Sequence, residues 1–352
     1  MISFVWMSNY PFLAGTGGSE NYTAGHIREL RRRDIDAEII TIGLGEQDGR
    51  HDFPDISFRA IGSPQELSAL DTTLVFVIYP IDVPTKHPSY VILHCPLSLC
   101  DREQSFSVKG TRNKRLIAPS NYAATLWAKH FSRQHVPVVY PFADQAFSAV
   151  PIPARTSDKL KILFAGRLTP DKGVYTLMAA LHFKILRDLN FELTATTACD
   201  HSEEGKLVRT LLEAHPLITV VPARKSPQAM AELMAEQDIV VMPTTDQFWH
   251  EAFGIVSVEA QHAGCRVVAS NAGGLPETDC GGLVLVEPDN PLALAQGIAK
   301  AAALGRLTPK ERAQAATQFT VNRSVDTLLD LMREDNMNAP YTTHLMTKVR
   351  KN

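Results

Sequence analysis

The chain has 352 residues, 45% of them hydrophobic, which is enough to fill the cores of two α/β domains. Its formal net charge of −3 includes no strong basic excess, and this argues against nucleic acid as a main partner. The five cysteines are odd in number and form no CxxC pair, which argues against a disulfide framework and a cysteine-based zinc site.

Short apolar runs alternate with stretches of helical periodicity along the chain. The strands expected in the first half are 2–7, 37–42, 73–78, 90–94, 115–118 and 136–140. The helices expected there are 19–33 and 121–130. The strands expected in the second half are 161–165, 191–196, 218–221, 239–242, 266–269 and 283–286. The helices expected there are 174–187, 202–214, 227–235, 255–263, 291–303 and 321–332.

Residues 150–157 interrupt this alternation with two prolines among small and polar residues, and they predict a linker. Strands that alternate with helices predict parallel sheets covered by helices. We therefore expect an α/β fold of two Rossmann-like, doubly wound lobes, with residues 1–150 in the first and 158–320 in the second. Such sheets bind ligands at the carboxyl ends of their strands, so the cleft between the lobes is the expected site.

A glycine-rich segment, residues 15–20, follows the first expected strand and precedes a helix. Gly17 and Gly18 would let the backbone approach a phosphate or a sugar, and the helix N-terminus would add free N–H groups. The same segment could be only a flexible turn. It is not a GxGxxG fingerprint, which makes a dinucleotide-binding site a weak alternative.

Two cations, Arg167 and Lys172, lie in the loop after the first expected strand of the second lobe. A guanidinium and an ammonium on one such loop suit a diphosphate. The alternative is a pair of solvated loop cations.

Two carboxylates, Glu251 and Glu259, flank the expected start of a helix. Carboxylates accept hydrogen bonds from sugar and ribose hydroxyls, and the N–H groups of a helix start hold phosphate. The residues at that start are Phe253, Gly254, Ile255 and Val256. A helix with one solvated and one capping glutamate is the alternative. The glycine-rich turn 271–277 could close the same pocket.

Together these motifs resemble the large retaining family of two-lobed (GT-B) glycosyltransferases, the glycosyl transferases group 1. This family includes bacterial mannosyl- and glucosyltransferases and relatives of glycogen synthase and sucrose-phosphate synthase. The matching motifs are GG-x-E at 17–20, G-R and K-G within 166–173, E-x7-E at 251–259 and A-G-G-x-x-E at 272–277.

The resemblance implies a nucleotide sugar held mainly by the second lobe, a hydroxyl acceptor held by the first, and a last helix, 321–340, that crosses back to the first lobe. It implies a retaining, front-face transfer in which the leaving phosphate takes the proton of the incoming hydroxyl. It also implies that neither a metal nor a cofactor is needed, because Arg167, Lys172 and a helix start neutralise the diphosphate.

The resemblance assigns catalytic roles to His94, Glu251, Arg167 and Lys172. His94 is the candidate for a histidine beside the transferred sugar, although Cys95 and Pro96 follow it where many members have Asp or Gly. Glu259, Arg224 and Lys225 are the candidates for contacts with the ribose and the base.

Basic residues at 31–33 and 109–115 suggest contact with an anionic membrane or a lipid-linked acceptor, the alternative being a solvated surface. The apolar start is too short for a signal-peptide core, and no stretch approaches ~20 apolar residues. We expect a cytoplasmic protein, with peripheral contact at the inner membrane face left open.

Other functions stay open at this point. A nucleotide-sugar 2-epimerase or a phosphorylase of the same fold would bind similar ligands, and a non-catalytic nucleotide-sugar-binding subunit would need no chemistry. The sequence names neither the sugar nor the base nor the acceptor, which could be a glycan, a lipid-linked glycan or a small molecule.

Overall fold

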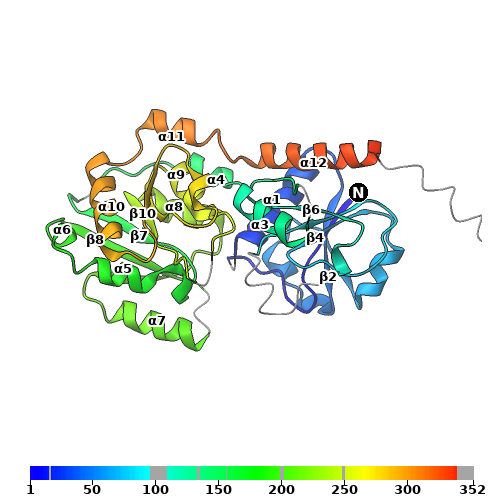
Figure 1. Ribbon diagram of the computed structural model, residues 1–352, viewed down its shortest axis with the longest axis horizontal. Coiled ribbons are helices and arrows are strands. Elements are labelled where there is room, and N and C mark those ends of the chain that lie inside the picture. Colours follow the sequence, from blue (N-terminus) through cyan, green and yellow to red (C-terminus); the bar gives the residue numbers. More distant parts are fainter. Residues whose placement is uncertain are drawn as a thin grey trace, which may run out of the picture.

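The computed structural model describes residues 1–15, 17–95, 109–132, 135–155, 157–198, 202–247 and 250–338. Of the features discussed above, Thr16, Pro96, Cys100, Cys199 and residues 339–340 lie outside this part. The described chain forms two α/β lobes, each built on a six-stranded sheet (Figure 1). The predicted fold class is confirmed.

The first lobe contains the sheet β3-β2-β1-β4-β5-β6, in which every pair is parallel. Its strands are β1 (Ile2–Val5), β2 (Ala37–Ile42), β3 (Phe58–Ile61), β4 (Thr73–Val77), β5 (Ser89–Ile92) and β6 (Lys114–Ile117). Its helices are α1 (Gly18–Arg32) and α3 (Asn121–His130), with short 3-10 turns η1 (Gly45–Gln47), η2 (Arg50–Asp52), η3 (Pro64–Ala69) and η4 (Lys109–Thr111).

The second lobe contains the parallel sheet β12-β11-β10-β7-β8-β9. Its strands are β7 (Leu160–Phe164), β8 (Phe191–Thr197), β9 (Ile218–Pro222), β10 (Ile239–Met242), β11 (Arg266–Ser270) and β12 (Leu283–Val286). Its helices are α5 (Val174–Ala180), α6 (Lys184–Arg187), α7 (Glu203–Glu213), α8 (Pro227–Ala235), α9 (Ile255–His262), α10 (Pro291–Leu304) and α11 (Pro309–Ala315), with the turns η5 (Pro170–Lys172) and η6 (Leu275–Thr278).

Both sheets have the Rossmann order, in which the third, second and first strands of the lobe are followed by the fourth, fifth and sixth. The order reverses between β1 and β4 in the first lobe and between β7 and β10 in the second. Crevices open at such reversals, at the carboxyl ends of the strands. The loops after β7 and β10 therefore lie where a ligand is expected.

Apolar side chains alternate between the two faces of each sheet, as strand geometry requires. In β7, Ile162 and Phe164 pack toward α5, α7 and α10, whereas Leu163 packs toward α8 and α9. In β1, Phe4 packs toward α1, whereas Val5 packs toward α3. Each sheet is thus covered on both faces.

Some expected elements differ from those observed. Residues 136–140 form no strand, because only Val138 pairs, in an isolated bridge with Ala118. The expected helix 174–187 is divided into α5 and α6 around Leu181–Phe183. The strand β3 was not expected, because two of its four residues are exposed and its apolar pattern is weak.

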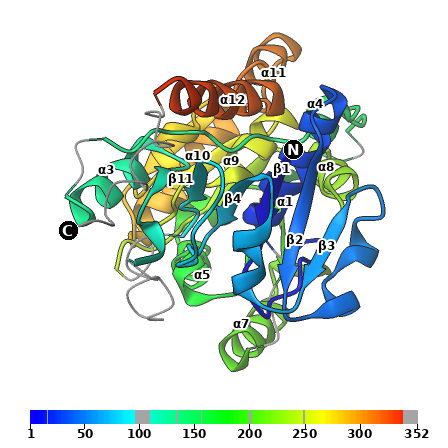
Figure 2. The same ribbon diagram turned by 90° about the vertical axis from the view of Figure 1, so that its right-hand side faces the viewer.

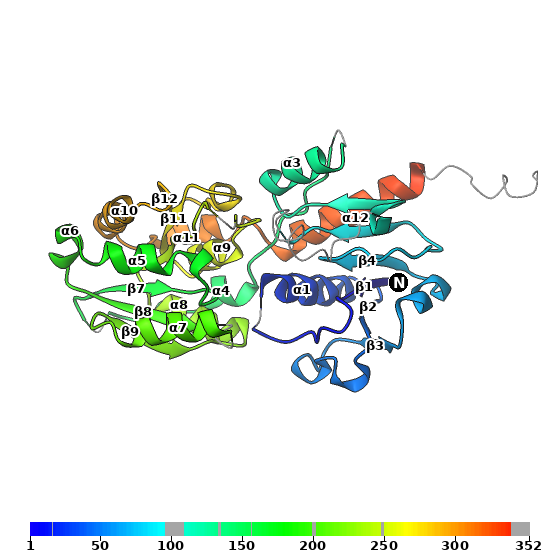
Figure 3. The ribbon, with the colours of Figure 1, turned by 60° about the horizontal axis from the view of Figure 1, so that its bottom comes forward.

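The chain passes twice between the lobes. The first passage leads to α4 (Gln145–Ala149), which packs against α8 and α9 of the second lobe through Phe147 and lies where the lobes meet in Figure 3. The chain therefore enters the second lobe before the proline-rich segment. The second passage joins α11 to α12 (Val321–Asn338), and the Ala143 N–H donates to the Phe319 carbonyl at 3.1 Å between the two.

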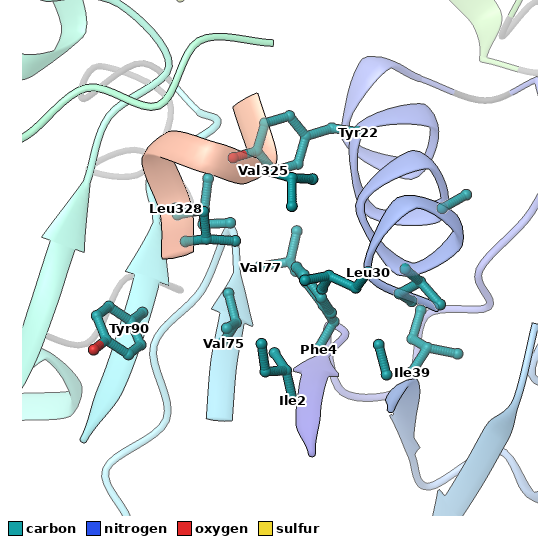
Figure 4. Close-up of a cluster of buried hydrophobic side chains, with 14 of the residues drawn as sticks. Ile2, Phe4, Tyr22, Leu30, Ile39, Val75, Val77, Tyr90, Val325 and Leu328 are labelled. Carbon is teal, nitrogen blue, oxygen red and sulfur yellow. The ribbon is translucent and has the colours of Figure 1, made fainter. Parts of the chain in front are cut away.

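The C-terminal helix α12 returns to the first lobe, as expected. Figures 1 and 2 show α11 and α12 along the same edge of the molecule, with α12 over the first lobe, where it packs against α1. Its Val325 and Leu328 are fully buried and face Tyr22, Leu30 and the strands of the first sheet (Figure 4). This packing makes α12 part of the first lobe's core.

Candidate functional site

A cavity of about 440 Å³ lies between the lobes, within the size range of small-molecule sites. All the residues that the sequence predicts for the site line it. From the first lobe these are Gly17, Gly18 and His94. From the second they are Arg167, Lys172, Arg224, Lys225, Glu251, Phe253, Gly254, Ile255, Val256 and Glu259.

The loop after β7 delivers two cations to the cavity. The 3-10 turn η5 ends at Gly173, whose φ of 74° is left-handed and whose missing Cβ would lie 1.7 Å from the Pro243 carbonyl oxygen. Only glycine fits this position, which places Lys172 at the end of the turn. Arg167 pairs with Ala198 in an isolated bridge, and its Nη2 lies 3.8 Å from Oδ2 of Asp171.

Lys172 and Glu251 form an ion pair within the cavity. Lys172 Nζ donates to Glu251 Oε1, and the two side chains are only 14% and 15% exposed. Solvent therefore screens this pair less than a surface pair. The contact links the loop after β7 with the loop after β10.

The helix α9 begins at the cavity without a side-chain cap from any described residue. Its N-cap, Gly254, has a φ of 98°, and a Cβ there would lie 2.6 Å from Cδ2 of Leu275. Ile255 and Val256 follow and line the cavity. A helix start of this kind offers backbone N–H groups and positive potential to an anion.

Glu259 lies inside α9 and is 7% exposed. Burial, and to a smaller extent the charge of Asp144, raises the pKa of Glu259 to about 8. The carboxyl group is therefore largely protonated at neutral pH, and it can both donate and accept a hydrogen bond.

His94 follows β5 at the first-lobe side of the cavity. Burial, and then the neighbouring His26, lowers the pKa of His94 to about 3, so the imidazole is neutral. Its ring packs edge-on against Tyr22, with ring centroids 4.6 Å apart. Within the described chain its Nε2 is buried and has no hydrogen-bond partner.

The glycine-rich loop of the first lobe reaches the second lobe. A Cβ on Gly15 would lie 3.0 Å from Cα of Lys225, and one on Gly18 would lie 3.3 Å from Cγ2 of Ile255. Arg224 and Lys225 are exposed and connect β9 to α8. The loop thus closes one side of the cavity, and side chains at these glycines would crowd the contact.

Several lining residues were not predicted from the sequence. They include Thr196 near the end of β8, Ala198 after β8, Thr244 after β10, Met230 of α8, and Asn21 of α1. None belongs to a motif. The one signal that could have found some of them is their position at the carboxyl ends of parallel strands.

Comparisons with known proteins bear on the second lobe most directly. Residues 159–303 match the family model described as "Glycosyl transferases group 1". The second lobe belongs to this family. Two curated relatives of the chain are the lipopolysaccharide 1,2-N-acetylglucosaminetransferase of Salmonella typhimurium (32% identity over 170 residues) and the D-inositol 3-phosphate glycosyltransferase of Saccharomonospora viridis (30% identity over 207 residues).

These matches cover 45% and 54% of this chain and 42% and 45% of the two relatives, so the chain spans less than half the length of each. They support the expectation that the group 1 glycosyl transferase lobe belongs to a transferase enzyme.

Solved structures resemble the whole chain. A glycosyltransferase from Rickettsia africae superposes with a TM-score of 0.74 at 19% identity, over 96% of this chain and 99% of that one. Sucrose-phosphate synthase from Thermosynechococcus elongatus superposes with a TM-score of 0.69 at 15% identity, over 96% of this chain and 100% of that one. Anabaena Alr3699/HepE, crystallised with UDP and glucose, superposes with a TM-score of 0.68 at 18% identity, over 95% of this chain and 100% of that one. The group 1 lobe is thus one half of a GT-B fold.

The described residues lack two features that concern membrane contact and metal binding. In those ranges no helix is both long and apolar enough to cross a membrane. The same part of the chain contains no group of three or more His, Cys, Asp or Glu side chains that could hold a metal ion.

Proposed function

We propose that this protein is a retaining glycosyltransferase that moves a sugar from a nucleoside diphosphate sugar to a hydroxyl acceptor without a metal. The observation that carries the proposal is the convergence of Arg167, Lys172 and the start of α9 on one cavity. Together they provide the positive charge that a diphosphate requires.

In the proposed complex the diphosphate lies between the loop after β7 and the start of α9. Arg167 offers a planar fork of donors, and Lys172 offers a point charge. Negative charge grows on the leaving phosphate as the bond to the sugar breaks, so these groups stabilise the transition state more than the ground state. The chain itself thus supplies the electrophilic assistance.

Glu251 and His94 are placed to hold the sugar. Glu251 accepts hydrogen bonds from sugar hydroxyls while its other contact, Lys172, orients the carboxylate. The neutral His94 lines the same cavity from the first lobe, and we assign it a contact with the donor sugar. In this proposal residues of both lobes therefore contact the same sugar.

The transfer itself is a front-face substitution. The bond between the anomeric carbon and the phosphate oxygen breaks as the acceptor oxygen forms its new bond on the same face. The acceptor proton passes to the leaving phosphate oxygen, so no side chain becomes covalently attached to the sugar.

The proposed acceptor is a hydroxyl-bearing carbohydrate or small molecule. Arg32 pairs with Glu29, Arg33 pairs with both Glu29 and Asp326, and Arg115 pairs with Asp335, so each of these three predicted basic residues has an acidic partner. That pairing supports a solvated surface more than a membrane-binding patch. We place the protein in the cytoplasm, since the buried Cys265 and Cys280 are free thiols.

The test is incubation with a panel of UDP, GDP and ADP sugars in the presence of EDTA, with and without a panel of acceptors, followed by NMR of the products. A product that keeps the donor's anomeric configuration and needs the acceptor supports the proposal. Conversion of a donor alone into its 2-epimer would establish the epimerase instead. Activity that is lost in EDTA and restored by Mg²⁺ or Mn²⁺ would reject the metal-free mechanism.

A further inference from the structure

The glycine-rich turn that follows β11, residues 271–277, does not line the cavity as the sequence suggested, and instead contacts the first lobe. It ends in Glu277, a second-lobe carboxylate that lies against the N-terminus of α3 in the first lobe. The Glu277 carboxylate accepts hydrogen bonds from the backbone N–H groups of Asn121 at 2.8 Å and Tyr122 at 2.7 Å. It also accepts from Asn121 Nδ2 at 3.0 Å and from the Tyr140 hydroxyl at 2.9 Å.

These two N–H groups are the first of α3 and cannot bond within the helix. The next, that of Ala123, is capped by Ser120 Oγ at 3.0 Å. A residue of the other lobe thus completes the capping of α3. The negative charge of the carboxylate also suits the positive end of the helix dipole.

A second bond crosses the lobes at the same place. The Ser120 hydroxyl donates to the carbonyl oxygen of Ala252, the residue that follows Glu251. The Gly274 N–H donates to the carbonyl of Glu251 itself at 2.7 Å. The backbone that carries the Glu251 carboxylate is therefore held from both sides, by α3 and by the glycine-rich turn.

The turn is rigidly attached to the second lobe. Thr278 Oγ1 donates to Ser257 Oγ of α9 at 2.8 Å, and Gln261 Nε2 donates to the Thr278 carbonyl at 2.9 Å. Gly274 allows a close approach, because a Cβ there would lie 2.4 Å from the Ala252 carbonyl oxygen. Movement of α3 relative to Glu277 would therefore be transmitted to the start of α9 and to the Glu251 loop.

We propose that Glu277 and Ser120 form an interlobe clamp that positions Glu251 in the closed, transfer-competent arrangement of the lobes. This proposal rests on the proposed function, because it assigns Glu251 to the donor sugar. Glu277 is a positioning residue, since it acts through α3 and the Glu251 loop. Burial, and secondly the bond to Glu277, raises the pKa of Tyr140 to about 12, so its hydroxyl stays a donor at neutral pH.

The clamp is tested first without turnover, by residue-resolved amide hydrogen exchange on the full chain. In Glu277→Ala the amides of Asn121 and Tyr122 should exchange at least about tenfold faster, while that of Ala124, which bonds to the Ser120 carbonyl, keeps its rate. Glu287→Gln is the control, because Glu287 is an exposed second-lobe carboxylate that bonds Asn290. Parent exchange rates at Asn121 and Tyr122 in the Ala variant would overturn the clamp.

The positioning role is tested with UDP, GDP or ADP, whichever binds the parent, and with its glucose conjugate. Glu277→Gln should change the affinity for the nucleoside diphosphate less than about twofold, yet lower kcat roughly tenfold, the lower limit for one charge-assisted bond. The difference in affinity between the glucose conjugate and the nucleoside diphosphate alone should also become smaller. A purely structural role of Glu277 would not change that difference. Tyr140→Phe, which removes one bond and preserves shape, should show the same pattern more weakly.

Unchanged kcat in Glu277→Gln with accelerated exchange in Glu277→Ala would overturn the positioning role. If the parent transfers no sugar at all, the proposed function fails, whereas the exchange measurement still decides whether the clamp exists.

Discussion

Lys172 Nζ donates a hydrogen bond to Oε1 of Glu251, although 79 residues separate the two in the chain. The residues follow β7 and β10, which are neighbours at the point where the strand order of the second sheet reverses. A bound diphosphate would share the Lys172 ammonium with Glu251. This relationship determines how each of the two side chains should respond to substitution.

Glu251→Gln should separate binding of the diphosphate from binding of the sugar. The amide releases Lys172 from its ion pair, so affinity for the nucleoside diphosphate should stay the same or rise. Turnover should fall about 10- to 150-fold, because a charge-assisted bond to the sugar is lost. Calorimetry and initial rates on the same variant measure the two effects. Loss of nucleoside diphosphate affinity would mean that Glu251 supports the phosphate site instead.

His94→Gln should lower kcat strongly and leave nucleoside diphosphate affinity nearly unchanged, since His94 approaches the cavity from the first lobe. Because the pKa of His94 is lowered to about 3, its imidazole does not titrate between pH 5 and 8. The pH profile of kcat for the parent should therefore show no ionisation near pH 6.5 that is missing from the profile of the variant. Such an ionisation, present only in the parent, would contradict the neutral imidazole.

Acid should destabilise the protein through its buried histidines. Burial lowers the pKa of His26 and His262 to about 4, and of His94 to about 3, against an ordinary value near 6.5. Below about pH 6.5 the unfolded chain binds protons that the folded chain does not, so the free energy of unfolding falls as pH falls. At pH 5 each histidine lowers the free energy of unfolding by on the order of 1–2 kcal/mol relative to neutral pH.

His262→Gln tests this directly, because His262 lies in α9 and does not line the cavity. The variant should lose less stability than the parent between pH 7 and pH 5 in denaturant titrations. Parallel stability curves for the two proteins would rule out a contribution from His262.

Much of the fold was predictable, because buried parallel strands and amphipathic helices each have a strong periodic signal. The strand 239–242 was expected where β10 is observed, since all four residues are apolar and buried. Residues 136–140 are equally apolar but form no strand, because this segment passes between the lobes and pairs only at Val138. The apolar pattern of a segment indicates that its residues are buried. It does not distinguish residues buried between the lobes from residues buried in a sheet.

The composition of the candidate site was also predictable, whereas its contacts were not. Arg167, Lys172, Glu251 and Glu259 could be chosen because motifs follow strand ends, where parallel sheets place ligands. The ion pair of Lys172 with Glu251 depends on the distance between two loops, which no sequence spacing encodes. The role of Glu277 depends on how the lobes meet, so the A-G-G-x-x-E motif that contains it did not indicate an interlobe contact.

Glu259→Gln should stabilise the ligand-free protein increasingly as pH rises. Burial raises the pKa of Glu259 to about 8 from an ordinary value near 4.5, so the folded state retains a proton that the unfolded state loses. The parent therefore loses stability between about pH 4.5 and 8, and the amide removes that loss. At pH 8 the melting temperature of the variant should exceed that of the parent, and the difference should shrink as the pH is lowered toward 5. A difference that does not vary with pH would show that Glu259 ionises normally.

The most direct test of the diphosphate site is calorimetry in EDTA with the parent, Arg167→Ala, Lys172→Ala and the control Lys184→Ala, whose side chain is 78% exposed on α6. Each protein is titrated with the nucleoside diphosphate that binds the parent and with the corresponding bare nucleoside. We predict that either site variant loses about 10- to 150-fold in diphosphate affinity, while nucleoside affinity and the control stay at the parent values. Parent-level diphosphate affinity in both site variants would contradict the assignment of this cavity to a nucleoside diphosphate sugar.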